Sequence, residues 1–272
     1  MAKRRFLLGR RKSPLDRLTV HEFSYDDARV RVYELWTMTG DAAEAPDMTT
    51  FALVHGLGVS SRFFVPLAQA LAPYGRVLLL DLPGFHDLPK PKRTLSIVDF
   101  ADLVKRTLDG MDVVDPLLVG HSMGAQVVTE ILAQYPDYCS AAMLIGPVVV
   151  AGERALPSVA MRFIQGAVYE RMGNSLAAIA SYARAGPRWI VQVVPTVLAY
   201  PIEDRLPLAT ARLLVVSGEH DRISPLPWRK SLAARHDDAQ VITIAGAAHG
   251  VVYDRHRELT DELVALAGLG TA

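Results

Sequence analysis

The sequence has a single cysteine, no long hydrophobic run and no excess of charge of either sign. Cys139 cannot form an internal disulfide, so nothing in the 272 residues points to an oxidising compartment; we expect a cytoplasmic protein in which Cys139 fills the core. A membrane-spanning helix needs about 20 apolar residues, and the longest apolar stretches, 141–151 and 189–200, are too short or are interrupted. The formal net charge is zero, which gives no reason to expect nucleic acid as a partner.

Patterns that would hold a metal or a nucleotide are also missing. No Cys and His residues recur at the spacing of a zinc site, and no glycine-rich phosphate loop follows an early strand. We therefore expect neither a metal nor a cofactor. Half of the residues are hydrophobic, which is enough for one large core, and an α/β domain of this length is often single.

The first 18 residues differ from the rest, because they carry many basic side chains against one acid, Asp16. A signal peptide is not expected, since the apolar segment 6–8 is far shorter than the roughly 7–15 residues required. We predict that residues 1–18 form a disordered, solvated tail. A weak contact of this tail with an anionic lipid surface is the alternative.

After the tail, strand patterns and helix patterns alternate along the chain. The expected strands are residues 20–25, 28–38, 51–55, 77–80, 117–119, 141–145, 212–216 and 240–244, with a polar loop at 40–48. Apolar residues three or four apart predict helices at 63–71, 96–111, 125–135, 226–234 and 253–267. This alternation indicates an α/β fold with a mostly parallel sheet that helices cover on both faces.

Residues 148–206 break the alternation, because they contain no convincing strand and their helical patterns are interrupted by glycine and proline. A structureless segment of this length is improbable inside a compact domain. We predict a helical cap that interrupts an α/β core of residues 19–147 and 207–268. Its apolar residues would form a roof over a ligand site. The candidate substrate contacts are Phe85, Met161, Tyr182 and Trp189, although packing is the commoner role for any one of them.

The chemistry is centred on residues 117–128. A short apolar strand pattern runs into Gly120-His121-Ser122-Met123-Gly124 and continues as a helical pattern. Strand, sharp turn and helix are the context that the G-x-S-x-G motif requires. Side chains at Gly120 and Gly124 would collide with the crossing backbone, so the turn presents Ser122 at its tip, beside a helix N-terminus. We predict that Ser122 is a nucleophile.

A serine hydroxyl needs a base within reach and a third group that orients the base. His249 is the candidate base, because it follows the last strand in a loop of small residues, and catalytic groups gather at the C-terminal ends of parallel strands. The acid is expected in the loop after the strand at 212–216. Asp221 is our choice, and Glu219 in the same loop is the alternative.

Negative charge that develops on a substrate carbonyl needs N–H donors. The backbone N–H of Met123, directly after the predicted nucleophile, supplies one. The N–H of Leu57 supplies the other, because Gly56 and Gly58 let that loop approach a substrate. His55 is expected to order the same loop.

Five motifs in this order resemble the α/β-hydrolase superfamily, in particular its cap-bearing branch of serine esterases and lipases. They are His55-Gly56-Leu57-Gly58, Asp81-Leu82-Pro83-Gly84-Phe85, Gly120-His121-Ser122-Met123-Gly124, Gly218-Glu219-His220-Asp221 and Gly246-Ala247-Ala248-His249. The resemblance covers residues 20–266 and implies an eight-stranded, mostly parallel sheet whose second strand is antiparallel, with the cap after strand 6. It supports a triad of Ser122, Asp221 and His249, and oxyanion donors at Leu57 and Met123.

One motif departs from the family pattern. Relatives continue Asp-x-Pro-Gly-x with Gly-x-Ser, whereas here Phe85 is followed by His86-Asp87-Leu88-Pro89. We expect a solvated turn at this point. The alternative places His86 at the rim of the pocket.

The predicted reaction is hydrolysis of a carboxylic ester of a small or medium hydrophobic substrate through an acyl-enzyme. A serine at the turn argues against the carboxylate chemistry of related epoxide hydrolases and dehalogenases. Two alternatives stay open. The same triad would also serve C–C bond hydrolysis, thioester hydrolysis or acyl transfer, and the fold would also serve a ligand-binding protein without turnover.

Overall fold

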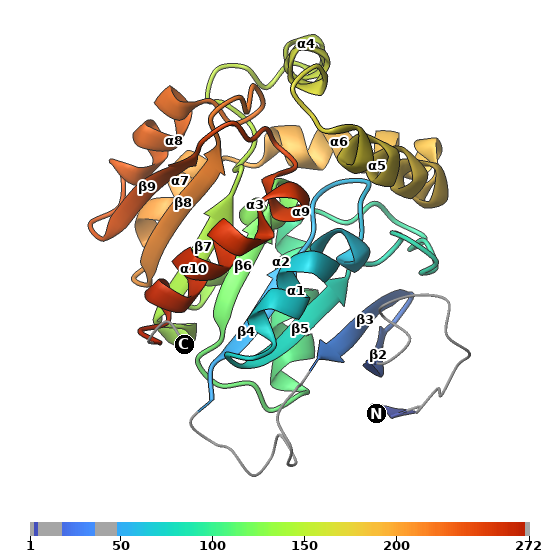
Figure 1. The fold of residues 1–272 in the computed structure, drawn as a ribbon. Helices are drawn as coiled ribbons and strands as arrows, with labels where there is room; N and C mark the ends of the chain where they lie inside the picture. The colour runs from blue at the N-terminus through green and yellow to red at the C-terminus, as the bar shows by residue number, and fades with distance from the viewer. Residues whose placement is uncertain (1–2, 5–17, 36–47, 270–272) are drawn as a thin grey trace.

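A computed structural model describes residues 3–4, 18–35 and 48–269, which are built around one nine-stranded sheet (Figure 1). Its order is β1-β2-β3-β5-β4-β6-β7-β8-β9. The strands are β1 (Lys3–Arg4), β2 (Thr19–Tyr25), β3 (Ala28–Leu35), β4 (Thr50–Val54), β5 (Arg76–Asp81), β6 (Leu117–His121), β7 (Ala141–Ile145), β8 (Arg212–Gly218) and β9 (Ala239–Ile244).

The eight predicted strands correspond to β2 to β9. Strands β4 to β9 pair in parallel, and β3, the second of the eight, runs antiparallel to both β2 and β5, as expected. The additional strand β1 comes from the predicted tail and pairs antiparallel with β2. Residues 1–2 and 5–17 of that tail lie outside the described residues. So do residues 36–47, which include most of the predicted loop at 40–48 and the end of the predicted strand at 28–38.

Helices cover both faces of the sheet, and alternate strand residues reach opposite sides, as the two-residue period of a strand requires. In β4, Phe51 and Leu53 join the apolar cluster beneath α1 (Val65–Leu71), α9 (Val251–Asp254) and α10 (His256–Leu266). Ala52 and Val54 join the cluster beneath α2 (Ile97–Asp109), α3 (Met123–Gln134) and α8 (Leu226–Ala233). Short 3-10 turns occupy Ser61–Phe64, Pro136–Tyr138 and Leu206–Leu208.

Four helices connect β7 to β8 within the segment predicted as a cap. They are α4 (Leu156–Ala167), α5 (Met172–Ala185), α6 (Pro187–Ala199) and α7 (Ile202–Arg205). Helices α4, α5 and α6 lie beyond the C-terminal ends of the parallel strands (Figure 1). Helix α6 buries Trp189, Val193 and Val197 in the main core, whereas α4 and α5 leave several apolar side chains exposed. The limits of the cap as a separate domain stay a prediction.

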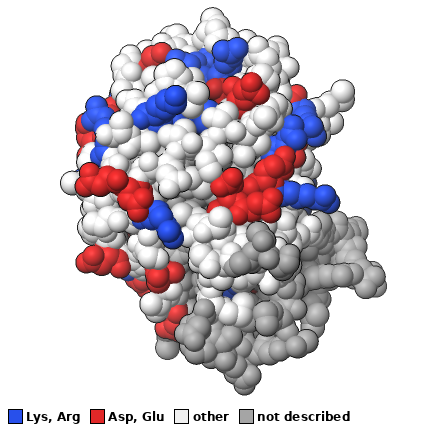
Figure 2. Space-filling view, turned by 60° about the vertical axis from the view of Figure 1, so that its left-hand side comes forward, with Lys and Arg blue, Asp and Glu red and all other residues white. Residues whose placement is uncertain are grey.

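Surface and burial agree with the composition. Acidic and basic side chains are interspersed on the face drawn in Figure 2. Among the described residues, no helix is both long enough and apolar enough to cross a bilayer. Cys139 is buried just before β7, and burial raises the pKa of its thiol to about 12, which fits the predicted role in the core.

Helix α2 begins at a capping box that fixes its entry onto the sheet. The Ser96 hydroxyl accepts the Asp99 N–H at 3.1 Å, and the Asp99 carboxylate accepts the Ser96 N–H at 2.7 Å. Arg93 also pairs with Asp99, and this hydrogen bond is the main reason why the pKa of Asp99 lies well below its usual range. The reciprocal bonds satisfy backbone donors that a helix start leaves unpaired.

We expect Ser96→Ala to lower the free energy of unfolding by about 1 kcal/mol, because it removes the side-chain cap. Urea denaturation measures the change. Ser231→Ala, at an exposed position inside α8, deletes the same hydroxyl without removing a cap and should change stability by only a few tenths of a kcal/mol. Equal effects of the two substitutions would contradict the capping role.

Candidate active site

The turn from β6 into α3 holds Ser122 in a backbone conformation that few side chains adopt, with φ 57° and ψ −118°. Two backbone crossings enforce this turn. A Cβ atom at Gly120 would lie 2.3 Å from the carbonyl oxygen of Gly124, and a Cβ at Gly124 would lie 2.1 Å from that of Val54. Glycine is required at both positions, as the motif indicated.

His249 and Asp221 come from separate loops and form a buried pair. His249 Nδ1 lies 2.8 Å from Asp221 Oδ2, and Asp221 is only 3% exposed. The other Asp221 oxygen accepts the N–H groups of Ile223 at 2.8 Å and Ser224 at 2.9 Å, and Ser217 Oγ donates to Oδ2. Burial disfavours the charge of Asp221, but His249 and these donors outweigh it and hold the pKa of the carboxyl well below its usual range.

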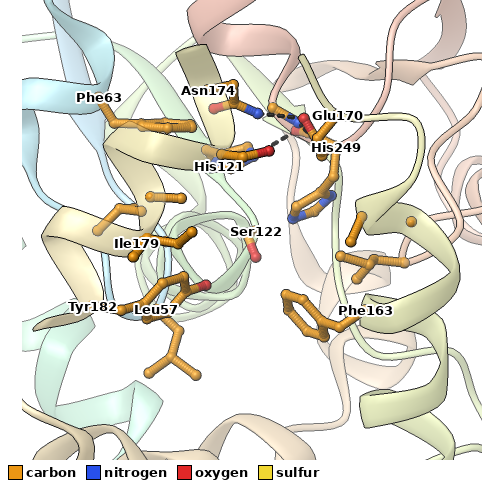
Figure 3. Close-up of a pocket in the computed structure, with 18 residues that line it drawn as sticks. Leu57, Phe63, His121, Ser122, Phe163, Glu170, Asn174, Ile179, Tyr182 and His249 are labelled. Atoms are coloured by element: carbon orange, nitrogen blue, oxygen red, sulfur yellow. Dashed lines mark hydrogen bonds between the residues drawn. The ribbon is translucent and has the colours of Figure 1, made fainter. Parts of the chain in front are cut away.

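The same pair sets the protonation of the imidazole. Burial by itself lowers the pKa of His249, but the charge and the hydrogen bond of Asp221, assisted by Glu170, raise it above the ordinary value. Since a carboxylate accepts hydrogen bonds, Nδ1 carries the proton in the neutral ring and Nε2 is left as the basic nitrogen. Ser122 and His249 line one cavity and lie close to each other there (Figure 3).

Glu219, the alternative acid, has another partner. Its Oε2 accepts the N–H of Gly246 at 2.9 Å, so that it joins the loop of Asp221 to the loop of His249 at an exposed point. Of the two carboxylates, the structure thus brings Asp221 to His249. His55 orders the loop after β4, as expected: its Nδ1 lies 2.8 Å from Gly56 O, and its Nε2 accepts the Leu82 N–H at 3.0 Å.

The loop that carries Leu57 lies against the turn at Ser122. A Cβ atom at Gly56 would be 2.9 Å from Cβ of Ser122, so only glycine permits this approach. Leu57 lines the cavity, and Met123 is the first residue of α3, where the N–H groups of the first turn have no partner within the helix. The two predicted backbone donors thus lie on the two segments that meet at Ser122.

The cavity has a volume of about 230 Å³ and a mostly apolar lining. Tyr182 lines it, as predicted, and its ring lies on the bare backbone of Gly58, where a Cβ atom would be 2.0 Å from Cε1 of the tyrosine. Figure 3 shows Phe63, Phe163, Ile179 and Tyr182 around Ser122, with Glu170 and Asn174 near His249.

Three of the four predicted substrate contacts do not line the cavity. Phe85 is fully buried and packs edge-on against Trp189, with ring centroids 6.3 Å apart, so both belong to the core beneath α6. Met161 is 53% exposed, because the face of α4 that carries Phe163 and Gly166 is the one turned to the cavity. These three predictions are corrected.

The chain does turn at His86 and Asp87, as expected, but the prediction that His86 is solvated is wrong. The side chain is only 8% exposed, and its Nε2 lies 3.1 Å from Asp87 Oδ2. Burial lowers the pKa of His86. The residue does not line the cavity either, so the alternative at the pocket rim finds no support.

Several cavity residues were missed by the sequence analysis. Those on α4, on α5 and in the connection between them recur at a spacing of three or four residues and line one side of the insertion. This spacing could have indicated that they share a face. They are Phe163, Gly166, Ala167, Glu170, Asn174 and Ala178. Ile179 shares this spacing, since it lies three residues before Tyr182 on α5, whereas Phe63 carried no signal beyond being apolar.

Comparison with known proteins decides the family. A family model described as the alpha/beta hydrolase family matches residues 51–262. The chain belongs to the α/β-hydrolase family. The predictions of this superfamily, of its fold and of an enzyme are thereby confirmed.

Individual relatives of this α/β-hydrolase are distant. A putative non-heme haloperoxidase of a Mycobacterium phage is 32% identical over 93 residues, 34% of each chain, so the match spans about a third of that relative. A monoacylglycerol lipase of Mycolicibacterium smegmatis is 27% identical over 84% of this chain and 89% of its own. The structure of an N-acyl homoserine lactone degrading enzyme superposes with a TM-score of 0.77 at 19% identity, covering 90% and 99% of the two chains.

Gly146 gives a direct test of the site geometry. It has φ +55°, and a Cβ atom there would lie 2.9 Å from Cε1 of His249 and 3.2 Å from Oδ2 of Asp221. We expect Gly146→Ala to displace the imidazole and to reduce hydrolysis of an activated ester about 10²-fold, since a shift of about 1 Å has that cost.

Gly152→Ala is the matched control. Gly152 also has positive φ, +82°, but nothing lies within 4 Å of its Cβ position. Both substitutions therefore carry the backbone cost of an alanine in this region, and only Gly146→Ala should lose turnover. Equal losses in the two variants would contradict the proposed crowding at His249.

Proposed function

We propose that this α/β-hydrolase cleaves carboxylic esters of small or medium hydrophobic substrates through an acyl-enzyme on Ser122. The observation that carries the proposal is the buried Asp221–His249 pair, which leaves the basic nitrogen of His249 in the same cavity as a serine at a strained turn. The names of the relatives, a lipase and a lactone-degrading enzyme among them, are consistent with ester chemistry.

The steps follow from the positions of the groups. Ser122 Oγ attacks the substrate carbonyl while His249 Nε2 takes the hydroxyl proton. The tetrahedral oxyanion is stabilised by the N–H groups of Leu57 and Met123. When the intermediate collapses, the alcohol leaves with the proton from His249, and the acyl group stays on Ser122. Water then repeats the sequence with His249 as base and releases the acid.

The role of Asp221 in these steps is electrostatic. Its carboxylate keeps the proton of neutral His249 on Nδ1 and stabilises the imidazolium that forms when the serine is deprotonated. His249, together with the donors from Ser217 and Ser224, keeps the carboxylate ionised although it is buried. The acid therefore orients and stabilises but does not itself accept a proton.

The cavity limits the substrate class. Its volume of about 230 Å³ lies at the small end for a ligand pocket, since such pockets usually measure about 300–1,000 Å³. The lining of Phe63, Phe163 and Ile179 favours an apolar chain. Short to medium acyl groups fit this space. The cytoplasmic location, the absence of a nucleic-acid partner and the solvated basic tail stay predictions, with contact of that tail with an anionic surface as the alternative.

A chain-length series of p-nitrophenyl esters tests the proposal. We expect kcat/KM to be highest at about four to eight acyl carbons and to fall for longer chains, because these exceed the cavity volume. Pre-steady-state traces should show a burst of nitrophenol. Ser122→Ala should lose the burst and at least about 10³-fold in kcat, since it removes the nucleophile. Undiminished turnover in this variant, or turnover of diketones but not of esters, would exclude the proposed reaction.

The choice of acid is tested by a pair of substitutions in one loop. Asp221→Asn should reduce kcat about 10³–10⁴-fold, because an amide no longer selects the imidazole tautomer. Glu219→Gln should stay within a few-fold of the parent enzyme, since its carboxylate contacts Gly246 and not His249. Steady-state kinetics on one ester compares the two variants. The reverse order would assign the role to Glu219.

A further inference from the structure

The peptide unit between His249 and Gly250 is held at both ends. His121 Nε2 lies 3.0 Å from the carbonyl oxygen of His249, and the N–H of Gly250 lies 2.9 Å from Glu170 Oε1. A carbonyl oxygen only accepts, so His121 carries its proton on Nε2 and donates it. Burial lowers the pKa of His121 to about 3, so the ring stays neutral in this role. The two bonds fix the plane of the peptide that follows the catalytic base.

The two partners come from different parts of the molecule. His121 is the last residue of β6, directly before Ser122, and belongs to the rigid centre of the sheet. Glu170 lies between α4 and α5, in the helical insertion above the cavity (Figure 3). The core therefore holds the carbonyl end of this peptide, and the insertion holds the N–H end.

Neighbouring residues fix the orientation of the Glu170 side chain. Asn174, which is 3% exposed, donates from Nδ2 to the second oxygen of Glu170. The contact requires glycine at position 250, because a Cβ atom there would lie 1.7 Å from Asn174 Nδ2 and 2.7 Å from Glu170 Oε2. The backbone of Gly250, the carboxylate of Glu170 and the side-chain amide of Asn174 thus pack together at the turn after His249.

The same segment of the insertion also lies on the acid loop. Arg162 Nη1 donates to the carbonyl oxygen of Arg222 at 2.8 Å, next to Asp221. The ring of Tyr169 stacks on His220 at 5.0 Å between centroids, and the guanidinium of Arg222 lies over the same ring. Residues 162–170 therefore contact both loops that carry the catalytic pair.

We infer that Glu170 is a positioning residue for His249, and that it makes turnover depend on residues 162–170 being docked on the two catalytic loops. This inference rests on the proposed function. If the bond to Gly250 is lost, the peptide plane is held only by His121, and rotation of the plane moves the imidazole relative to Ser122. Loss of an aligned base lowers kcat more than it affects binding.

The charge of Glu170 has a second effect, on the pKa of His249, which can be measured separately from the effect of the hydrogen bond. The titratable groups that face His249 among the described residues are Asp221 from the acid loop, His121 from β6 and Glu170 from the insertion. Glu170 favours the imidazolium, so its removal lowers the pKa of His249. Because the base works as neutral imidazole, the acidic limb of kcat/KM lies at the pKa of His249 and must then move to lower pH.

Two substitutions separate the bond from the charge. Glu170→Gln can still accept the Gly250 N–H but is neutral, so we expect kcat within about five-fold of the parent and an acidic limb at lower pH. Glu170→Ala removes both, and we expect kcat to fall roughly 10- to 100-fold with KM changed less than about three-fold. The pH profiles are measured with p-nitrophenyl butyrate on the full chain.

Glu219→Ala is the matched control, since it removes a carboxylate that accepts a backbone N–H in the same loop, from Gly246. It should leave the acidic limb unchanged. The inference is overturned if Glu170→Ala and Glu219→Ala give the same profile and the same kcat. It is also overturned if Glu170→Ala changes KM alone, because Glu170 would then be a substrate contact.

Hydrogen exchange provides a readout that does not need activity. The Gly250 amide should exchange faster in Glu170→Ala than in the parent and in Glu219→Ala, because its acceptor is gone. If the parent protein hydrolyses no ester, the proposed function fails, while this exchange rate still tests the bond. Unchanged exchange at Gly250 would overturn the inference whatever the activity.

Discussion

The close crossing of two backbones at the end of β6 is the constraint on which the rest of the site depends. Gly124 passes the carbonyl of Val54 at a distance that no side chain permits, and this contact forces the turn that places Ser122 at φ 57°. A strained residue persists only where its surroundings over-determine it. Here the parallel pairing of β4 with β6 and the packing of α3 on the sheet supply that support.

Near this turn, the fold stabilises a negative charge that is buried. A carboxylate with 3% exposure is costly unless every lone pair is occupied. The loop after β8 folds its own N–H groups back onto Asp221, and His249 returns from the loop after β9 to complete the set. The parallel neighbours β8 and β9 end at the same edge of the sheet, so residues distant in sequence meet there.

The fold and the centre of the site could be predicted from the sequence, because both depend on local chemistry. Strand periodicity gave β2 to β9, and loop position separated His249 from the other histidines. Phe85, Met161 and Trp189 could not be placed, since apolar composition is the same for a core residue and a pocket residue. The burial of His86 could not be predicted either, because charged groups around it, Arg62 and Arg184, come from distant parts of the chain. The role of Glu170 could not be predicted, because its hydrogen bond to Gly250 depends on how the insertion packs on the loop after β9.

The contact between Tyr182 and Gly58 has a consequence for the evolution of substrate preference. The aromatic ring rests on a backbone that carries no side chain, in a loop whose neighbour Leu57 faces the cavity. One added carbon at position 58 would collide with this ring, and φ there is +77°, a conformation that side chains rarely adopt, so the ring and the loop that carries Leu57 could not both keep their positions. A change of side chain at position 58 would therefore alter the cavity wall at Tyr182 and the Leu57 loop together, so substrate preference cannot be changed here independently of that loop.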